Sequence, residues 1–290
     1  MISLVRRVAT VCVLGAALTT LAACGTGPVP QRAERQPSAL PSVAPSRPPT
    51  LAPGPAGLTP VFRNGPRTPD KAVALTFDAD MTAGQGDRAG RGERFDNPGL
   101  IASLRTLKVP ATVFMTGRWA EEYPVQARSI GRDPLFEIGN HSYSHYAFTE
   151  DCYGLPTIAG DGSGSEERMR ADVERAFSAF RAAGVPGAMP YFRFPGGCHD
   201  RRALRALSTA GVTAVQWDVV SGDAFATDAD AVAREVLDRV QPGSVVVMHC
   251  TRSAAPATER AVRTIVPALR GRGFRFVKVS ELIGATSGRR

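Results

Sequence analysis

Imidazole and carboxylate side chains follow apolar segments of the sequence in a pattern that suits a metal ion. The chain has four histidines, and three of them, His141, His145 and His249, stand at or just beyond the ends of such segments. Two imidazoles and a carboxylate, as His141 and His145 supply with a nearby carboxylate, make the ligand set of catalytic zinc sites that keep one position open for water. A metal in such a site polarises an acyl oxygen and lowers the pKa of its water, so the pattern predicts hydrolysis of an amide or ester.

Further polar residues in the same kind of position supply an acid and a base. Asp78, Arg193, Asp223 and His249 each lie at or beyond the end of an apolar run. Hydrolysis needs one group that accepts a proton and another that donates one. Taken singly, each residue is more often a cap or a hydrogen-bonding residue, but together with the metal ligands they predict a catalytic site.

These residues can form one site only if the strands before them end at the same edge of a sheet. Apolar runs predict strands, and they alternate with helical segments as in a parallel β/α fold. The predicted strands are 72–77, 111–115, 136–139, 191–193, 213–217, 244–248 and 274–278. The predicted helices are 98–107, 165–183, 201–210, 229–240 and 258–270. About seven β/α units in roughly 220 residues favour a barrel over an open doubly wound sheet, and both folds place the active site at the carboxyl ends of the strands.

Local signals mark the starts of two of these helices. Asp96 or Asn97 can cap the first helix, with Pro98 in its first turn. Ser165 is the expected cap of the long helix, which ends near Gly184.

The amino-terminal segment indicates export. Arg6 and Arg7 precede an apolar run, 8–21, which ends in small residues before Cys24, and this is the pattern of a secretory signal peptide over residues 1–23. The run falls short of the roughly 20 apolar residues that a membrane-spanning helix needs. The ending Leu-Ala-Ala-Cys resembles the bacterial lipobox, which implies lipidation of Cys24; an ordinary signal peptide with an incidental cysteine is the alternative.

A spacer and one folded domain are expected to follow. Residues 24–60 are rich in Pro, Ala, Ser and Gly, a composition that predicts an extended linker without a core. The folded domain is expected over residues 61–290. The protein is therefore predicted to work as a lipoprotein at the outer face of the cell membrane, anchored through Cys24.

The net charge of +8 favours binding partners that carry negative charge, such as nucleic acid, an anionic membrane face or an acidic cell-wall polymer. The positive side chains are mostly scattered arginines and no nucleic-acid-binding motif accompanies them, so nucleic acid is not an expected partner. Arg88, Arg91 and Arg94 lie in a Gly-rich segment, 81–94, at the predicted active-site edge. They either meet an anionic glycan or belong to an ordinary solvated loop.

Five ordered motifs resemble those of the NodB-homology polysaccharide deacetylases, carbohydrate esterase family four, over about residues 71–282. The first motif is matched by Thr76, Phe77 and Asp78, and the second, His-Ser/Thr-x-x-His, by His141, Ser142 and His145. The third, Arg-x-Pro-x-Gly, is matched by Arg193, Pro195 and Gly197. The fourth is matched by Trp217 and, six positions later, Asp223, and the fifth by His249. Together in this order the motifs are specific, whereas any one alone would be weak.

The resemblance implies a fold and a role for each matched residue. The implied fold is a distorted, incompletely closed (β/α)7 barrel, in agreement with the alternation of predicted elements. Asp78 is the implied catalytic base and His249 the general acid, while Arg193 orients Asp78 and Asp223 contacts Arg193. The expected substrate-binding residues are Trp217, Pro195 and Gly197. The implied cofactor is a divalent metal ion, zinc first, with cobalt or another divalent ion as the alternatives.

One metal-binding position departs from the family pattern. The Asp that follows the base is replaced by Ala79, and the nearest carboxylate is Asp80. Side chains alternate along a strand, so Asp78 and Asp80 are expected on one face and Ala79 on the other. Asp80 is therefore predicted to join His141 and His145 at the metal, with hydrogen bonding to the loop backbone as the alternative role.

Two other features concern the surroundings of the site. Ala224 and Phe225 stand where the family commonly has Trp after the fourth-motif Asp, which implies a differently shaped acetyl pocket. An exported protein can oxidise its cysteines, and a disulfide is predicted between Cys152 and Cys198, which follow the second and third motifs on neighbouring strands. Cys250 is expected to remain a buried thiol.

The sequence therefore predicts an exported, metal-dependent hydrolase that removes N-acetyl groups from a cell-wall polysaccharide. Peptidoglycan amino sugars are the first candidate substrate, because a lipid-anchored exported protein meets that polymer first. Chitin oligomers and an O-acetylated glycan are alternative substrates. A catalytically inactive glycan-binding lipoprotein is the alternative from another class, raised by Ala79. The chain is expected to act as a monomer.

Overall fold

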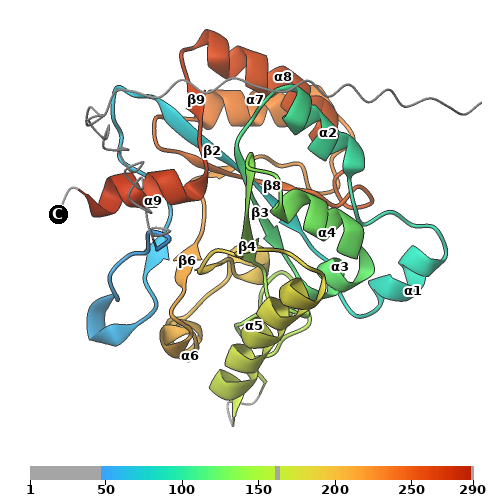
Figure 1. Cartoon of the computed structure of the whole chain (residues 1–290), viewed down its shortest axis with the longest axis vertical. Coiled ribbons are helices and arrows are strands. Elements are labelled where there is room, and N and C mark those ends of the chain that lie inside the picture. Colours follow the sequence, from blue (N-terminus) through green and yellow to red (C-terminus); the bar gives the residue numbers. More distant parts are fainter. Residues whose placement is uncertain (1–46, 161–163, 289–290) are drawn as a thin grey trace, which may run out of the picture. The chain divides into compact units, whose positions relative to one another are not determined.

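Parallel strands form a curled sheet whose carboxyl ends meet at one edge (Figure 1). The computed structural model describes residues 47–160 and 164–288, so the predicted signal peptide, Cys24 and the first part of the predicted spacer lie outside the described residues. The nine strands found in the described residues are ordered β1-β6-β5-β4-β3-β2-β8-β7, with β9 paired to β2. They are β1 (Val61–Phe62), β2 (Ala72–Ala79), β3 (Ala111–Met115), β4 (Phe136–Asn140), β5 (Tyr191–Phe192), β6 (Thr213–Val215), β7 (Val219–Val220), β8 (Val245–His249) and β9 (Arg275–Phe276).

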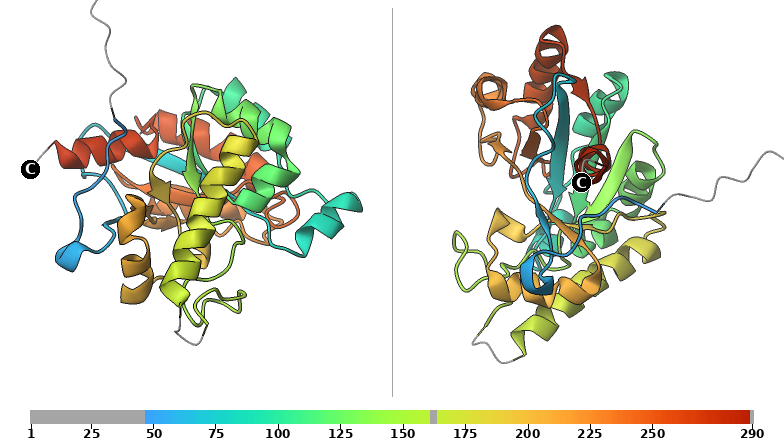
Figure 2. Two further views of the ribbon diagram at one scale, coloured as in Figure 1. Left: turned by 60° about the horizontal axis from the view of Figure 1, so that its bottom comes forward. Right: turned by 90° about the vertical axis from the view of Figure 1, so that its left-hand side faces the viewer.

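Helices cover the outside of this sheet (Figure 1, Figure 2). They are α1 (Gln85–Gly90), α2 (Pro98–Thr106), α3 (Gly117–Glu122), α4 (Pro124–Gly131), α5 (Ser165–Ala182), α6 (Arg201–Ala206), α7 (Ala229–Arg239), α8 (Thr258–Gly271) and α9 (Val279–Ser287), with 3₁₀ turns at Pro55–Gly57, Pro195–Gly197 and Ser208–Ala210. The helices α2, α7 and α8 pack together, and α3 packs on α5. Leu282 and Ile283 of α9 pack with Ala72 and Ala74 at the start of β2, so α9 covers the amino-terminal end of the barrel.

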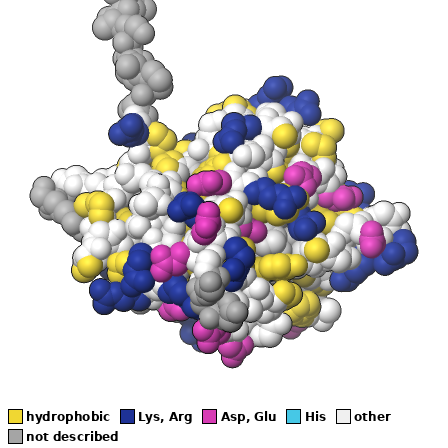
Figure 3. Space-filling model, turned by 90° about the horizontal axis from the view of Figure 1, so that it is seen from below, with side chains coloured by type: hydrophobic (Ala, Val, Ile, Leu, Met, Phe, Trp, Pro, Cys, Tyr) yellow, Lys and Arg dark blue, Asp and Glu magenta, His cyan; other side chains and the backbone are white. Residues whose placement is uncertain are grey.

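The surface carries charges of both signs. On the face seen in Figure 3, Lys and Arg side chains are interspersed with Asp and Glu. Several arginines have acidic partners, such as Arg105 with Asp133 at 2.7 Å. Within residues 47–160 and 164–288, no helix is both long enough and apolar enough to cross a membrane.

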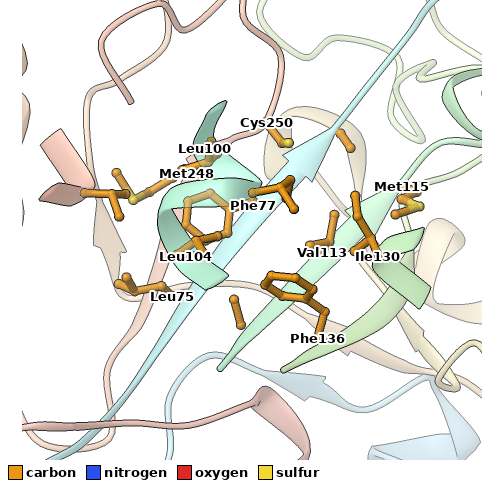
Figure 4. Packing of buried hydrophobic residues seen from close by; sticks show 14 of the residues in the cluster. Leu75, Phe77, Leu100, Leu104, Val113, Met115, Ile130, Phe136, Met248 and Cys250 are labelled. Carbon is orange, nitrogen blue, oxygen red and sulfur yellow. The ribbon is translucent and has the colours of Figure 1, made fainter. Parts of the chain in front are cut away.

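Both faces of β2 are buried, and its side chains alternate between two environments. Leu75, Phe77 and Ala79 belong to the main hydrophobic core, where Leu75 and Phe77 lie beside the side chains of α2 (Figure 4). Because successive side chains of a strand point to opposite faces, Thr76 and Asp78 point into the barrel. The core packing of the odd-numbered residues therefore fixes the direction of Asp78.

The barrel is not closed by hydrogen bonds between its strands in the described part of the chain. β1 and β7 form the two ends of the strand order, and β6 does not pair with β8. The chain leaves β6 at Val215 and rejoins the sheet as β7, which pairs in parallel with β8. Trp217 lies in the segment between these strands. The predicted distorted, incompletely closed (β/α)7 barrel is confirmed, and the doubly wound sheet is wrong.

Most predicted elements are present, with differences at their ends. Asn97 caps α2 by accepting a hydrogen bond from a backbone N–H of its first turn, as predicted. The prediction that Ser165 caps the long helix is wrong, because Ser165 is the first residue of α5 and Gly164 is the N-cap. The N-cap residue has a φ of 65°, which glycine adopts without steric cost. The predicted helix 201–210 breaks after Ala206.

The folded part begins earlier than the predicted boundary at residue 61. The Tyr191 hydroxyl donates a hydrogen bond to the Pro49 carbonyl at 2.7 Å, and the Leu51 N–H donates to Thr213 Oγ1 at 3.2 Å. Residues of the predicted spacer thus pack on the start of β5 and β6. Composition does not reveal this packing, because it depends on hydroxyl groups far along the chain that satisfy the backbone of the Pro-rich segment.

Candidate active site

The predicted site residues converge at the carboxyl ends of β2, β4, β5 and β8. Six of them, Asp78, Asp80, His141, His145, Trp217 and His249, line a cavity of about 590 Å³. Asp78 of β2 and His249 of β8 are partners in the register of their parallel strands, so both side chains face the cavity. Asp80, His141 and His145 line the same cavity. Residues far apart in the sequence are thus brought into one site by strand pairing.

Asp78 is buried and paired with the buried Arg193. Arg193 donates hydrogen bonds from Nη1 to Asp78 Oδ1 at 2.7 Å and from Nε to the Val215 carbonyl at 3.3 Å. Its guanidinium lies 4.0 Å from the ring centroid of Phe114 and 5.4 Å from that of Trp217. Burial alone would raise the pKa of Asp78, but the hydrogen-bonded Arg193 together with His141 and His249 outweighs burial and holds this pKa below its ordinary value. Asp78 is therefore a carboxylate at neutral pH, and Arg193 fixes its orientation.

His249 is held by Asp223. Asp223 Oδ1 lies 2.8 Å from His249 Nδ1, and Oδ2 accepts the backbone N–H of His249 at 2.7 Å. The hydroxyls of Thr258 and Ser221 donate to the same carboxylate. The prediction that Asp223 contacts Arg193 is wrong, because in the described residues its carboxylate is bonded to these three residues instead. Burial alone would lower the pKa of His249, but Asp223, helped by Asp78 and Asp80, outweighs burial and raises it to about 9, so this ring is an acid at neutral pH.

A tight turn after β4 places two imidazoles side by side. Asn140 Oδ1 accepts the N–H of Ser142 at 2.8 Å, and Ser142 Oγ accepts the N–H of His145 at 2.9 Å. The turn brings the rings of His141 and His145 to 5.0 Å between centroids. His141 Nδ1 lies 2.9 Å from the Arg193 carbonyl, which leaves Nε2 for the cavity. Burial lowers the pKa of His141, and a neutral imidazole is the form that binds metals.

Asp80 faces the histidines, and Ala79 faces away from them. Asp80 Oδ2 lies 4.0 Å from His145 Nε2, while Oδ1 accepts a hydrogen bond from Thr251 Oγ1 at 2.7 Å. Ala79 is buried in the hydrophobic core, as the alternation of strand side chains predicts. Across residues 47–160 and 164–288, no three His, Cys, Asp or Glu side chains are already drawn together as a metal-binding cluster.

The three expected substrate-binding residues have different positions. Trp217 lines the cavity. Gly197 lies against the Trp217 ring, where a Cβ would be 2.5 Å from Cη2, and its φ of 78° also favours glycine. Pro195 is buried and does not line the cavity. Ala224 and Phe225, which depart from the family pattern, both line the cavity.

Both predictions about cysteines are confirmed. Cys152 and Cys198 form a disulfide, which ties the loop after the second motif to the loop after β5. Cys250 is a buried free thiol, and burial raises its pKa to about 12. Cys250 therefore stays protonated and takes no part in the acid–base chemistry.

The Arg-rich segment after β2 forms α1 and part of the cavity wall. Arg88 lines the cavity but is paired with Glu93. Arg94 is paired with the buried Asp96 at 2.7 Å. Two of the three arginines therefore have acidic partners inside the protein, and this favours the reading of the segment as an ordinary loop over a binding wall for an anionic glycan.

Sequence reasoning missed the hydroxyl groups that hold the site carboxylates. Thr251 binds Asp80, and Thr258 and Ser221 bind Asp223. Thr251 is the second residue after β8, so its position just beyond a strand end was a sequence signal. Thr258 begins α8 and meets Asp223 only because the helix packs back on the barrel, which no local pattern indicates.

The arrangement defines a hydrolase site on an α/β barrel. An ionised carboxylate and a protonated imidazole face one cavity beside two further imidazoles and a second carboxylate. Such a pair suits the breaking of an acyl bond by water, because one group takes a proton from water and the other gives a proton to the leaving group.

The chain belongs to the polysaccharide deacetylase family, whose model matches residues 65–215. It is 29% identical over 188 residues to a chitooligosaccharide deacetylase of Azorhizobium caulinodans, covering 61% of this chain and 83% of that protein. It is 28% identical over 219 residues to a peptidoglycan-N-acetylglucosamine deacetylase of Bacillus cereus, covering 75% of this chain and 70% of that protein. The protein is therefore a polysaccharide deacetylase.

The fold is also similar to a solved structure. This is a carbohydrate esterase family 4 pseudoenzyme from Bacillus anthracis, with a TM-score of 0.61 and 22% identity over 81% of this chain and 70% of that chain. The likeness agrees with the incompletely closed barrel described above.

Proposed function

We propose that the protein is a metal-dependent deacetylase that removes N-acetyl groups from the amino sugars of cell-wall peptidoglycan. The observation that carries this proposal is that Asp78 and His249 face the same cavity as Asp80, His141 and His145. The similarity to the Bacillus cereus deacetylase supports the choice of substrate. Chitin oligomers and an O-acetylated glycan are the alternatives that the same chemistry allows.

Asp80, His141 and His145 fit a divalent metal by their chemistry and direction. Zinc takes neutral imidazole nitrogens and carboxylate oxygens at about 2.0–2.2 Å, so a tetrahedral ion holds two such atoms roughly 3.4 Å apart. Asp80 Oδ2 and His145 Nε2 are 4.0 Å apart, and a small side-chain movement brings them into this range. These three residues would hold zinc, or cobalt or another divalent ion. When bound, the ion activates water and polarises the acyl oxygen.

The other residues of the site move protons. Asp78 accepts the proton of the attacking water, and Arg193 keeps Asp78 ionised and directed at the cavity. As the water oxygen bonds to the acetyl carbon, the carbon–nitrogen bond breaks and His249 gives its Nε2 proton to the departing amine. Asp223 occupies Nδ1 of His249, so Nε2 is the nitrogen that faces substrate. The products are acetate and the free amino sugar.

Acetate release from defined glycans tests this proposal. The purified full-length protein is incubated with peptidoglycan, with N-acetylglucosamine oligomers and with an O-acetylated glycan, and acetate is measured. We expect release from peptidoglycan, loss of release after treatment with a chelator, and recovery on addition of zinc or cobalt. Full activity in metal-free protein would contradict the metal dependence, and faster release from another glycan would replace the proposed substrate.

The same measurement separates the enzyme from an inactive glycan-binding protein. Ala79 raises that alternative, since the family has a metal-binding carboxylate there. Asp80, at the next position, faces His145 and would supply the carboxylate that Ala79 lacks. Glycan binding without acetate release under every metal condition would support the inactive alternative.

A further inference from the structure

Exposed apolar side chains gather at the mouth of the catalytic cavity. Four large hydrophobic side chains of the described residues are strongly exposed, and three of them line this cavity: Tyr153, Val220 and Phe225. The fourth, Val125 on α4, does not line it. Tyr153 is the most exposed of the four, at 88%. Such a concentration of apolar surface marks a place where a ligand is bound.

Tyr153 is presented by a strained and cross-linked turn. Tyr153 has a φ of 54° and Gly154 a φ of 72°, and the turn is closed by a hydrogen bond from the Leu155 N–H to the Cys152 carbonyl at 3.0 Å. A bulky residue is rarely found in the left-handed region, and such strain persists where the surroundings impose it. The disulfide from Cys152 to Cys198 is the constraint that holds this turn to the loop after β5.

A second hollow adjoins the cavity at Tyr153. Its volume is about 380 Å³, and its lining shares Tyr153, Gly196 and Trp217 with the cavity. Its remaining lining is mostly polar and includes Arg63, Asp151 and His199. The side chains of Arg63 and Asp151 have no hydrogen-bond or ion-pair partner within residues 47–160 and 164–288. A charged donor and a charged acceptor are thus available to a bound molecule.

We propose that Tyr153 and this hollow form a second sugar-binding subsite, which makes Tyr153 a residue that determines the preference of the protein for long glycan chains. The inference rests on the proposed function, because it places the reacting sugar in the catalytic cavity and the next sugar of the chain beyond Tyr153. A pyranose ring has an apolar face of C–H groups, which stacks on an aromatic ring, and hydroxyl groups at its edge. Tyr153 offers the ring, and Arg63 and Asp151 offer partners for the hydroxyls.

The dependence of the rate on chain length tests the subsite. Acetate release by the full-length protein is measured on N-acetylglucosamine oligomers from the disaccharide to the hexasaccharide, and on solubilised peptidoglycan strands of graded length. We expect kcat/KM to rise with length until the second subsite is filled. Tyr153→Ala should lower kcat/KM for the longest oligomers roughly tenfold, the factor expected when about 60 Å² of apolar surface loses its partner, and chiefly through KM.

Two further variants make the result specific to stacking. Tyr153→Phe keeps the aromatic ring and should retain most of the length dependence. Val125→Ala removes an exposed apolar side chain that lies outside both hollows and should leave the kinetics unchanged. If Tyr153→Ala keeps the length dependence of the parent protein, the second subsite is wrong and the proposed deacetylase function is untouched.

A binding measurement distinguishes this failure from failure of the proposed function. The chain has two tryptophans; Trp119 is buried in the core, whereas Trp217 lines both hollows. Fluorescence titration with the hexasaccharide should therefore report binding, with a Kd roughly tenfold weaker in Tyr153→Ala. Binding that depends on Tyr153 without acetate release from any glycan would reject the enzyme and keep the subsite. If neither the N-acetylglucosamine oligomers nor the peptidoglycan strands bind, the subsite is rejected.

Discussion

At the scale of single residues, two buried pairs set the protonation state of the site. Arg193 keeps Asp78 ionised, and Asp223 keeps His249 protonated. The two groups are in the states that a base and an acid require at neutral pH, although burial of each group favours the opposite state. The site is thus charged before substrate arrives.

Replacing Asp223 should move the alkaline limb of the pH–rate profile. The active form needs His249 protonated, so activity should fall as pH rises through about 9, the pKa of this ring. Asp223→Asn removes the main charge that raises this pKa while burial still lowers it and Asp78 and Asp80 still raise it, and the limb should shift toward the ordinary histidine value of about 6.5. The profile of kcat/KM against pH measures the shift. An alkaline limb that stays in place would show that another group controls it.

Asp78 and Asp80 should separate by experiment, because one carboxylate handles a proton and the other faces the histidines. Asp80→Ala should lose bound metal and activity together. Asp78→Asn should lose about 10²–10⁴-fold in rate and keep most of its metal. Metal content after dialysis and zinc titration measure the first effect, and acetate release measures the second. An Asp80→Ala protein that binds zinc as tightly as the parent protein would refute its role as a ligand.

The sequence was sufficient to place some of these residues but not to pair them. The alternation of strand side chains predicts that Ala79 faces the core and Asp80 the site, because a period of two is a local property. The pairing of Asp223 with His249 spans 26 residues and depends on how the chain crosses from β6 to β7. No local pattern carries that information, and the predicted contact with Arg193 is wrong for this reason.

At the scale of secondary structure, the length of a strand decides whether the sequence can predict it. β2, β3 and β8 are buried on both faces, so each is a continuous apolar run that predicts a strand. β1 and β7 have two residues each, and they are strands only because β6 and β8 lie beside them. The unclosed side of the barrel lies between these two short strands. The way in which the barrel stays open was therefore not predictable from the sequence.

The disulfide between Cys152 and Cys198 should stabilise the domain. It closes a loop over a sequence separation of 46 residues, and cross-links of this kind typically contribute about 2–4 kcal/mol by restricting the unfolded chain. Double replacement by serine should lower the free energy of unfolding by this amount in urea titrations. Reductant should destabilise the parent protein and leave the double variant unchanged. Equal stability of the two proteins would show that the bond contributes nothing.

At the scale of the whole molecule, the described chain starts at the end of the barrel opposite the cavity. Pro49 and Leu51 contact residues at the start of β5 and β6, whereas the site lies at the carboxyl ends of the strands. Residues 49–51 therefore lie away from the mouth of the cavity.

We propose that the protein is exported and held at the outer face of the membrane through Cys24, which lies outside the described residues. The support is in the sequence: a basic start, an apolar run and the ending Leu-Ala-Ala-Cys form an export signal, and a lipid on the cysteine would anchor the mature chain. Cys24→Ala should move the protein from the membrane fraction to the medium or change its processing, as seen by immunoblotting of cell fractions. Cys12→Ala is the matched control, because Cys12 lies within the apolar run and should be removed with the signal peptide. A Cys24→Ala protein that stays with the membranes, like the control, would contradict the lipid anchor.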